Sequence, residues 1–160
     1  MSITHDELAG VVDLFGALTR PELTAALAEL AFKQGQDVDE SALQSTIEEA
    51  LDAYRLVEYE PAGSDGTEPL VAVGPTAFPT LPPNAEDLPH ILDYDRRTVD
   101  RERLAEQGRH RLMCEAEAAV EADDAEWAAE LLDVSYDIET WATVDAGAVR
   151  SALKPVLPQD

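Results

Sequence analysis

The stretch YRLVEYE, Tyr54–Glu60, is the point where the sequence changes from a helical to a strand pattern. Upstream of it, apolar residues recur at helical spacing, whereas residues 56–60 alternate apolar and acidic side chains as a half-buried strand does. The turn-rich loop PAGSDGTEP follows, and LVAVG, Leu70–Gly74, has the composition of a returning strand. The pattern therefore predicts a β-hairpin directly after a helix.

Three helices are predicted upstream of this hairpin. THDE and TRPE, which begin at Thr4 and Thr19, both fit a capping box, in which a threonine caps the helix and a glutamate three residues later reaches back. The second helix is expected to end at Gly35. A third helix is expected to begin near Ser41, with an apolar stripe that runs to Tyr54.

Beyond the hairpin, the chain is first rich in proline and then helical. Residues 75–89 hold half of the ten prolines, a density that excludes a regular helix or a central strand. We expect an extended connector there, then a helix over about residues 98–122 and a second helix capped at Asp123. A short last helix is expected to be capped at Asp145 and to end at Pro155.

The sequence therefore predicts a mainly α fold of the α+β class. Three parts are expected: a three-helix domain with a β-hairpin over residues 1–75, a proline-rich connector over 76–90, and a helical region over 91–157.

The element order over about residues 4–75, with YRLVEYE at the start of the hairpin, resembles the winged-helix family. This resemblance implies a three-helix domain whose hairpin forms the wing. In DNA-binding members the third helix enters the major groove, which would bring Gln44, Ser45 and Thr46 close to bases. The third helix here contains Glu48 and Asp52 and has no lysine or arginine, which disfavours contact with phosphates.

The acidic composition predicts the solvent in which the protein works. The formal net charge is −23, from 34 acidic and 11 basic residues. Such a surface repels itself in dilute buffer, but in molar salt the Debye length falls to about 3 Å and the repulsion is screened. The chain is similar to small acidic proteins of haloarchaea with a winged-helix-like N-terminal half. This resemblance implies a salt-rich cytoplasm and no particular activity.

Other features of the sequence also favour the cytoplasm. The N-terminal residues contain no basic region followed by an apolar signal core, and no apolar run is long enough to span a membrane. The single Cys114 cannot form an internal disulfide, which fits a reducing compartment.

Positive charge is concentrated between Tyr94 and Leu112, where six arginines occur. They could grip phosphates, because a guanidinium binds two phosphate oxygens at once. They could also pair locally, since Asp93, Asp100 and Glu106 precede arginines by three or four residues. A third alternative is an interface with an acidic patch of another chain. The arginines spread around a helical wheel, which favours pairing or an interface. They are Arg96, Arg97, Arg101, Arg103, Arg109 and Arg111.

Chemical sites are sparse in the sequence. His110, Cys114 and Glu117 share one helix face and could offer a metal two or three ligands, but no second Cys or His pair lies nearby in sequence. Cys114 and His110 are also the pair of nucleophile and base that the sequence offers, and a lone pair on one helix is not a catalytic motif. We therefore predict no cofactor, no metal site and no enzyme activity.

The sequence as a whole favours a non-catalytic interaction or regulatory module that acts by protein–protein contacts. Its partner would be another protein or a second copy of the chain, with no membrane and no small-molecule substrate involved. The alternative is a DNA-binding winged-helix transcription regulator, in which the third helix and the arginine cluster contact DNA.

Overall fold

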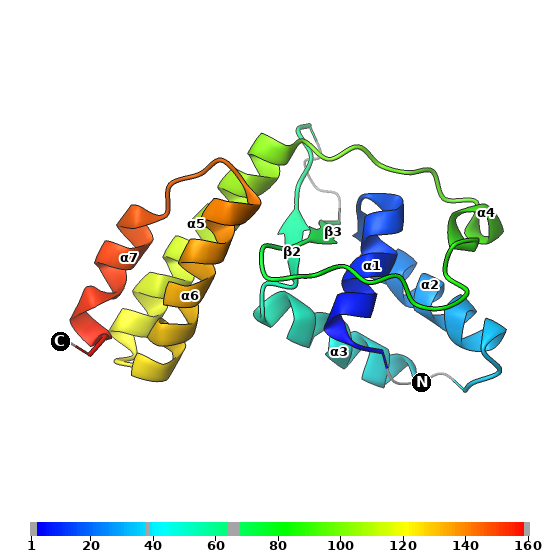
Figure 1. Ribbon diagram of the computed structural model, residues 1–160, viewed down its shortest axis with the longest axis horizontal. Helices are drawn as coiled ribbons and strands as arrows, with labels where there is room; N and C mark the ends of the chain where they lie inside the picture. The colour runs from blue at the N-terminus through cyan, green and yellow to red at the C-terminus, as the bar shows by residue number, and fades with distance from the viewer. Residues whose placement is uncertain (1–2, 38, 64–67, 159–160) are drawn as a thin grey trace. The chain divides into compact units, whose positions relative to one another are not determined.

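The computed structural model describes residues 3–37, 39–63 and 68–158 (Figure 1). Contacts within the chain divide it into two compact units, Met1–Val99 and Asp100–Asp160, here called unit 1 and unit 2. The fold is mainly α with a small antiparallel sheet, as the sequence predicted.

Unit 1 consists of helices and one three-stranded sheet. Its elements are α1 (His5–Phe15), β1 (Leu18–Thr19), α2 (Arg20–Lys33), α3 (Glu40–Asp52), β2 (Leu56–Tyr59), β3 (Leu70–Val73) and α4 (Leu88–Leu92). The strand order is β1-β3-β2, and both pairings are antiparallel. The predicted order of three helices and a hairpin is confirmed. The two-residue strand β1 was not predicted, because so short a strand has no periodicity to detect.

The helix starts in unit 1 follow the capping residues closely. Both predicted capping boxes form. The hydroxyl oxygens of Thr4 and Thr19 each accept a hydrogen bond from the backbone N–H of the glutamate three residues later. The backbone N–H of each threonine in turn donates to the carboxylate of that glutamate. Helix α3 begins at Glu40, one residue before the expected Ser41. Its cap is Asp39, whose carboxylate accepts from the backbone N–H of Ser41 at 3.0 Å, so Ser41 lies within the first turn.

The core of unit 1 forms between the three helices and the sheet. Its buried side chains include Leu8, Val12, Phe15, Leu23, Leu27, Leu30, Leu43, Ile47, Leu56 and Val71. The proline-rich connector also contributes, since Ala85 and Leu88 belong to the same buried cluster. The expectation of no regular helix over residues 75–89 was wrong at its end, because the short helix α4 begins at Leu88 with Pro89 in its first turn, where a missing N–H is tolerated.

The connector lies against α1. The backbone N–H of Thr80 donates to Asp6 O at 2.9 Å, and a Cβ at Gly10 would lie only 2.1 Å from Thr80 O. The connector and residues 91–99 therefore pack within unit 1, whereas we expected the helical region to begin at residue 91.

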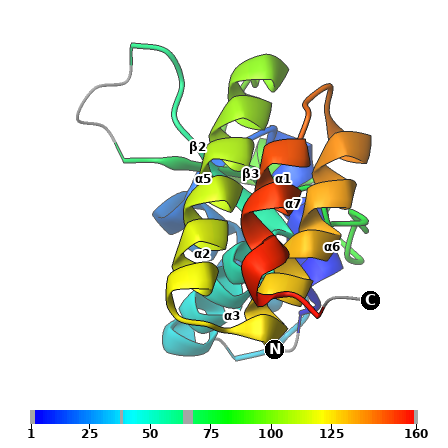
Figure 2. The same ribbon diagram turned by 90° about the vertical axis from the view of Figure 1, so that its left-hand side faces the viewer.

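Unit 2 is a group of helices. It contains α5 (Arg101–Glu121), α6 (Ala125–Trp141), α7 (Gly147–Leu153) and a short 3-10 turn, η1 (Lys154–Val156). The three α-helices pack against one another side by side (Figure 2). Their buried face includes Leu104, Leu112, Ala116, Leu131, Ile138, Val149 and Leu153.

The predicted helix starts in unit 2 were close but shifted. Asp124 caps α6 by accepting from the N–H of Trp127 at 3.0 Å, whereas we expected Asp123. Asp123 instead has a φ of 53°, in the left-handed region that ends α5. The N-cap of α7 is Ala146, one residue after the expected Asp145, whose carboxylate still accepts from Gly147 N at 2.8 Å.

Candidate interaction surfaces

The six arginines of the predicted cluster divide between the two units. Arg96 and Arg97 belong to unit 1, and the other four lie on α5 in unit 2. The two groups bind different kinds of partner.

The side chain of Arg97 links residue 97 to the start of α2. Its guanidinium holds Glu22 by two hydrogen bonds of 2.7 and 3.2 Å and also donates to Ala17 O at 3.0 Å. We expected Asp93, four residues earlier, as its ion-pair partner. Asp93 instead adopts a left-handed backbone conformation at the end of α4.

Glu22 is therefore shared between a helix cap and an ion pair. Partial burial acts to raise its pKa, but the hydrogen bonds from Arg97 and from the backbone of Thr19 outweigh burial and lower the pKa below its ordinary value. The ionised form of Glu22 is thus the one that both contacts require.

Arg96 binds the C-terminal end of α1. Its guanidinium donates to Asp13 O at 2.8 Å and to Leu14 O at 3.0 Å. Carbonyls in the last turn of a helix lack intrahelical partners, and a cation there also interacts favourably with the helix dipole. The two arginines of the predicted cluster that lie in unit 1 therefore stabilise the fold of that unit.

The arginines in the middle of α5 pair with carboxylates on the same helix. Arg109 pairs with Glu106, three residues earlier, as predicted. Arg111 pairs with Glu115, four residues later, at 2.6 Å. These contacts are of the local type that stabilises an isolated helix by a few tenths of a kcal/mol.

The arginines at the start of α5 have a different environment. The guanidinium of Arg101 lies 5.6 Å from the ring centroid of Trp141, a cation–π geometry. Asp100 caps the helix by accepting from the backbone N–H of Arg103 at 3.2 Å. The side chains of both Arg101 and Arg103 are exposed.

The outward side of α3 carries the three candidate base-contacting residues. Gln44 and Ser45 are exposed, whereas Thr46 is half-buried and its hydroxyl donates to Ala42 O at 2.9 Å. Glu48 on the same helix accepts from Arg20 at 2.8 Å. The guanidinium of Arg20 also binds Glu58 of β2 at 3.0 Å, so this cation is held between two carboxylates.

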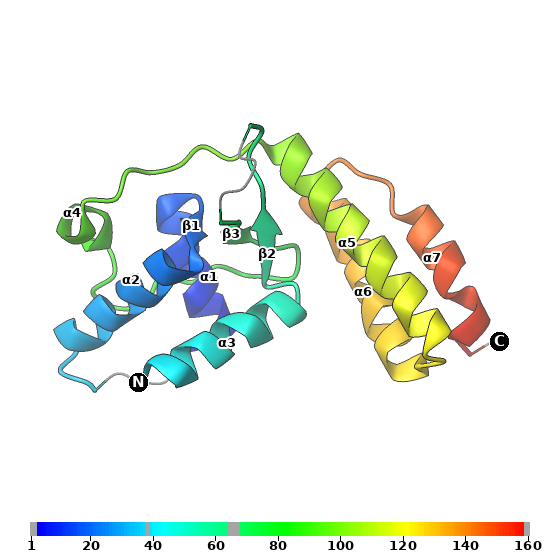
Figure 3. The same ribbon diagram turned by 180° about the vertical axis from the view of Figure 1, so that it is seen from behind.

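A cleft of about 490 Å³ lies between α2 and α3. The two helices run side by side in Figure 3 and contact each other directly. The lining of the cleft combines apolar side chains with polar ones, and carboxylates outnumber cations among the polar ones. Its lining residues are Pro21, Thr24, Ala25, Ala28 and Ile47, with Arg20, Glu40, Gln44, Glu48 and Glu68 around them. Sequence reasoning missed this cleft, because it depends on how two helices meet.

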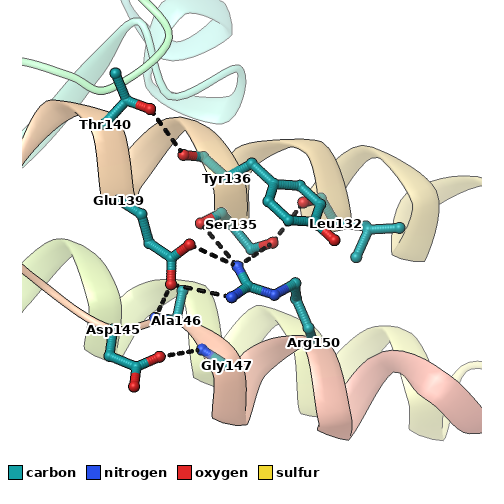
Figure 4. A network of polar contacts seen from close by, with 9 residues as sticks. All are labelled: Leu132, Ser135, Tyr136, Glu139, Thr140, Asp145, Ala146, Gly147 and Arg150. Atoms are coloured by element: carbon teal, nitrogen blue, oxygen red, sulfur yellow. Dashed lines mark hydrogen bonds and ion pairs between the residues drawn. The ribbon is translucent and has the colours of Figure 1, made fainter.

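A second network, in unit 2, holds α7 against α6 (Figure 4). Arg150 of α7 binds both carboxylate oxygens of Glu139 at 3.0 Å and lies over the ring of Tyr136 at 4.5 Å. Hydrogen bonds from Arg150 and from the backbone of Ala146 lower the pKa of Glu139. The contact with Glu139 likewise raises the pKa of Arg150. These residues stabilise the packing of α7.

The sulfur of Cys114 lies 3.7 Å from Nε2 of His110, on the exposed side of α5. The predicted proximity of these two side chains is therefore confirmed. Within the described part of the chain, no group of three or more His, Cys, Asp or Glu side chains is arranged to hold a metal ion.

Comparison with known proteins places the whole folded chain in one family. Residues 6–158 match a family of unknown function, DUF7109. The chain belongs to this family. No curated protein and no solved structure matches it. Among the described residues, no helix combines the length and the apolar character needed to cross a membrane.

Proposed function

We propose that this DUF7109 protein is a non-catalytic interaction module that binds another protein chain in the cleft between α2 and α3. The cleft itself carries the proposal: Pro21, Ala25, Ala28 and Ile47 contribute apolar side chains to its lining, and Arg20, Gln44 and three glutamates contribute polar ones. Protein–protein interfaces usually combine apolar and polar side chains. The element order of unit 1 fits a winged-helix-like domain, and such domains also serve as protein-binding modules.

The charges around the cleft support a protein over a nucleic acid. Glu40, Glu48 and Glu68 line it, and the charge of Arg20 is engaged by Glu48 and Glu58. Affinity for DNA comes mainly from phosphate contacts that release counterions, and carboxylates oppose them. In the predicted cluster, Arg96 and Arg97 are engaged within unit 1.

The remaining parts of the proposal rest on composition and on single residues. The net charge of −23 supports a salt-adapted archaeal cytoplasm as the setting. Cys114 and His110 lie together on one exposed face of α5, and such a pair on one helix is not by itself a catalytic motif.

A DNA-binding regulator is the second candidate, and the exposure of Gln44 and Ser45 favours it. Amides and hydroxyls at the start of a recognition helix read base edges in the major groove. In molar salt, contacts with DNA phosphates contribute little to the affinity of any protein. An acidic DNA-binding protein would therefore depend on contacts with base edges.

A capture experiment with matched variants separates these functions. The tagged protein is incubated with lysate of its native host at the host's own salt, with and without nuclease. Ala25→Glu places a carboxylate in the cleft, and Ala129→Glu makes the same change at an exposed position of α6. Alanine and glutamate are both good helix formers, so neither variant should unfold the chain.

We expect the captured protein partners to remain bound after nuclease treatment. The Ala25→Glu variant should lose these partners, and the Ala129→Glu variant should retain them. Partners that disappear with nuclease while DNA is recovered would favour the regulator. Partners retained equally by both variants would exclude the cleft as the binding site.

A further inference from the structure

We propose that the cleft between α2 and α3 binds an amphipathic helix of another protein, which brings two basic residues, two turns apart, to the two ends of the cleft. Apolar side chains between these basic residues would lie in the cleft. The proposal rests on the proposed function, since it requires that the cleft binds protein. It adds the secondary structure, the charge and the residue spacing of the bound segment.

Carboxylates lie at both ends of the cleft. Glu48 accepts from Arg20, the first residue of α2, at 2.8 Å, so Glu48 marks the end of the cleft at the start of α2. Glu40 lies eight residues earlier on α3, about 12 Å away along the helix at 1.5 Å per residue, and lines the cleft at its other end. Glu68 lines the cleft near Arg20, because it lies just before β3, which pairs with the strand that leads into α2.

The negative charge of the cleft is not balanced within the described structure. The guanidinium of Arg20 is held between Glu48 and Glu58 of β2, at 2.8 and 3.0 Å. Among the described residues, neither Glu40 nor Glu68 forms an ion pair. Both ends of the cleft therefore keep an excess of carboxylates, and the complementary partner brings a cation to each end.

The walls of the cleft suit a helix. Helices α2 and α3 run side by side along it (Figure 3). Pro21, Ala25 and Ala28 follow one another at intervals of four and three residues, so small side chains line the α2 wall. Small side chains let the backbone of a third helix approach closely, and Ile47 adds an apolar contact from α3. An amphipathic helix in a groove is a recurring mode of recognition between proteins.

The distance between the two ends sets the spacing of the basic residues. On a helix, residues i and i+7 share one face and lie about 10.5 Å apart along the axis. This separation is close to the axial distance between Glu40 and Glu48. Lysine or arginine at i and i+7 would therefore reach the two ends, and apolar side chains at i+3 and i+4 would lie near Ala25 and Ala28 between them.

Molar salt separates contacts in the cleft from general attraction to an acidic chain. The net charge of −23 attracts any cationic peptide in dilute buffer. At molar salt the Debye length of about 3 Å removes this long-range attraction. Ion pairs in direct contact are screened less, because their charged atoms are separated by about the same distance as the Debye length. Binding at molar salt therefore reports the contacts themselves.

Fluorescence anisotropy at molar potassium chloride, with the full chain and three labelled synthetic helices, tests the proposal. The first helix has lysines at i and i+7 and leucines at i+3 and i+4 in an alanine-rich background. The second has the same composition, with the second lysine at i+5, on another face. The third has glutamates in place of the lysines. We expect reversible binding of the first helix and binding at least about tenfold weaker for the other two.

Two double variants with the same change of net charge locate the binding site. Glu40→Gln with Glu68→Gln removes two carboxylates from the cleft. Glu117→Gln with Glu121→Gln removes two exposed carboxylates from α5. The cleft variant should bind the first helix about fivefold more weakly, and the α5 variant should bind it as the wild type does. Glutamine and glutamate have similar helix propensities, so circular dichroism should report the same helix content for both variants.

Three results would each overturn the proposal: equal affinity for the first and second helices, equal effects of the two double variants, or no binding up to millimolar peptide. The proposed function would survive any of them if the partners captured from lysate remained sensitive to Ala25→Glu. Peptide binding that Ala25→Glu leaves unchanged would place the peptide outside the cleft and would also contradict the proposal. Peptide binding that decreases as the chain self-associates would assign the cleft to a second copy instead.

Discussion

Two groups of arginines from one short stretch of sequence do different work in the two units. Arg96 and Arg97 reach partners between 75 and 83 residues away in the chain, at the ends of α1 and α2. Arg109 and Arg111 pair with carboxylates three and four residues away on their own helix. A local excess of positive charge therefore does not by itself indicate a ligand, because tertiary contacts can engage it.

The same comparison explains why the fold was easier to predict than the site. Capping boxes and hydrophobic periodicity are local, so α1, α2 and the hairpin follow from the sequence. The pair Arg109–Glu106 was predictable for the same reason. The partner of Arg97 was not, because Asp93 and Glu22 are both acidic and only the folded chain brings Glu22 close.

The cleft shows this limit most clearly. Ala25 and Ala28 look like ordinary surface alanines in the sequence, and Ile47 like an ordinary core residue. Their common function as the lining of one cleft depends on the packing of α2 against α3.

The largest effect that we expect comes from salt, and it compares the two units directly. Unit 1 has 19 acidic and 5 basic residues, a net charge of −14, and unit 2 has 15 and 6, a net charge of −9. Their charge per residue is similar, but unit 2 is smaller and buries less surface. Lowering salt from molar to tens of millimolar should therefore unfold unit 2 before unit 1.

Both tryptophans, Trp127 and Trp141, lie in unit 2, so their fluorescence follows that unit alone. Circular dichroism follows the helices of both units. We expect the fluorescence change to occur at higher salt than the loss of the remaining ellipticity. Ellipticity that is constant over the whole range would contradict the salt-adapted interpretation of the composition.

A smaller effect should come from Gly16, which the backbone of Arg97 approaches closely. Gly16 has a φ of 80°, and a Cβ there would lie 2.1 Å from Arg97 O. Gly35 has a φ of 70° but no neighbour within 4 Å. Gly35→Ala should therefore cost only the left-handed strain, about 1 kcal/mol. Gly16→Ala should cost about 3 kcal/mol, because the segment that carries Arg97 must also move.

Urea unfolding at molar salt, followed by circular dichroism, measures both free energies of unfolding. The tryptophan transition of unit 2 provides an internal control, since neither glycine lies in that unit. Equal losses for the two variants would contradict the predicted extra cost of displacing the backbone of Arg97.

The smallest effects that we expect on the free energy of unfolding come from replacing one arginine of each group. Arg97→Gln removes a partly buried pair with Glu22, whose side chain is 23% exposed, and should destabilise unit 1 by about 1 to 2 kcal/mol. Arg109→Gln removes an exposed pair on one helix and should cost about 0.3 kcal/mol. The same urea titration measures both losses, and equal losses would contradict the distinction.

The pH dependence of the stability lost in Arg97→Gln provides a second test. The pKa of Glu22 is lower in the folded chain than its ordinary value, so the folded state favours the ionised form. Its stabilising contribution is therefore complete above the ordinary carboxyl pKa, about 4.3, and is lost as the pH falls through the lowered folded value. The stability gap between wild type and Arg97→Gln should narrow over that acidic range, because protonated Glu22 no longer pairs with the guanidinium. A gap that stays constant down to the lowest pH at which unit 1 is folded would mean that Arg97 acts mainly through its hydrogen bond to Ala17 O.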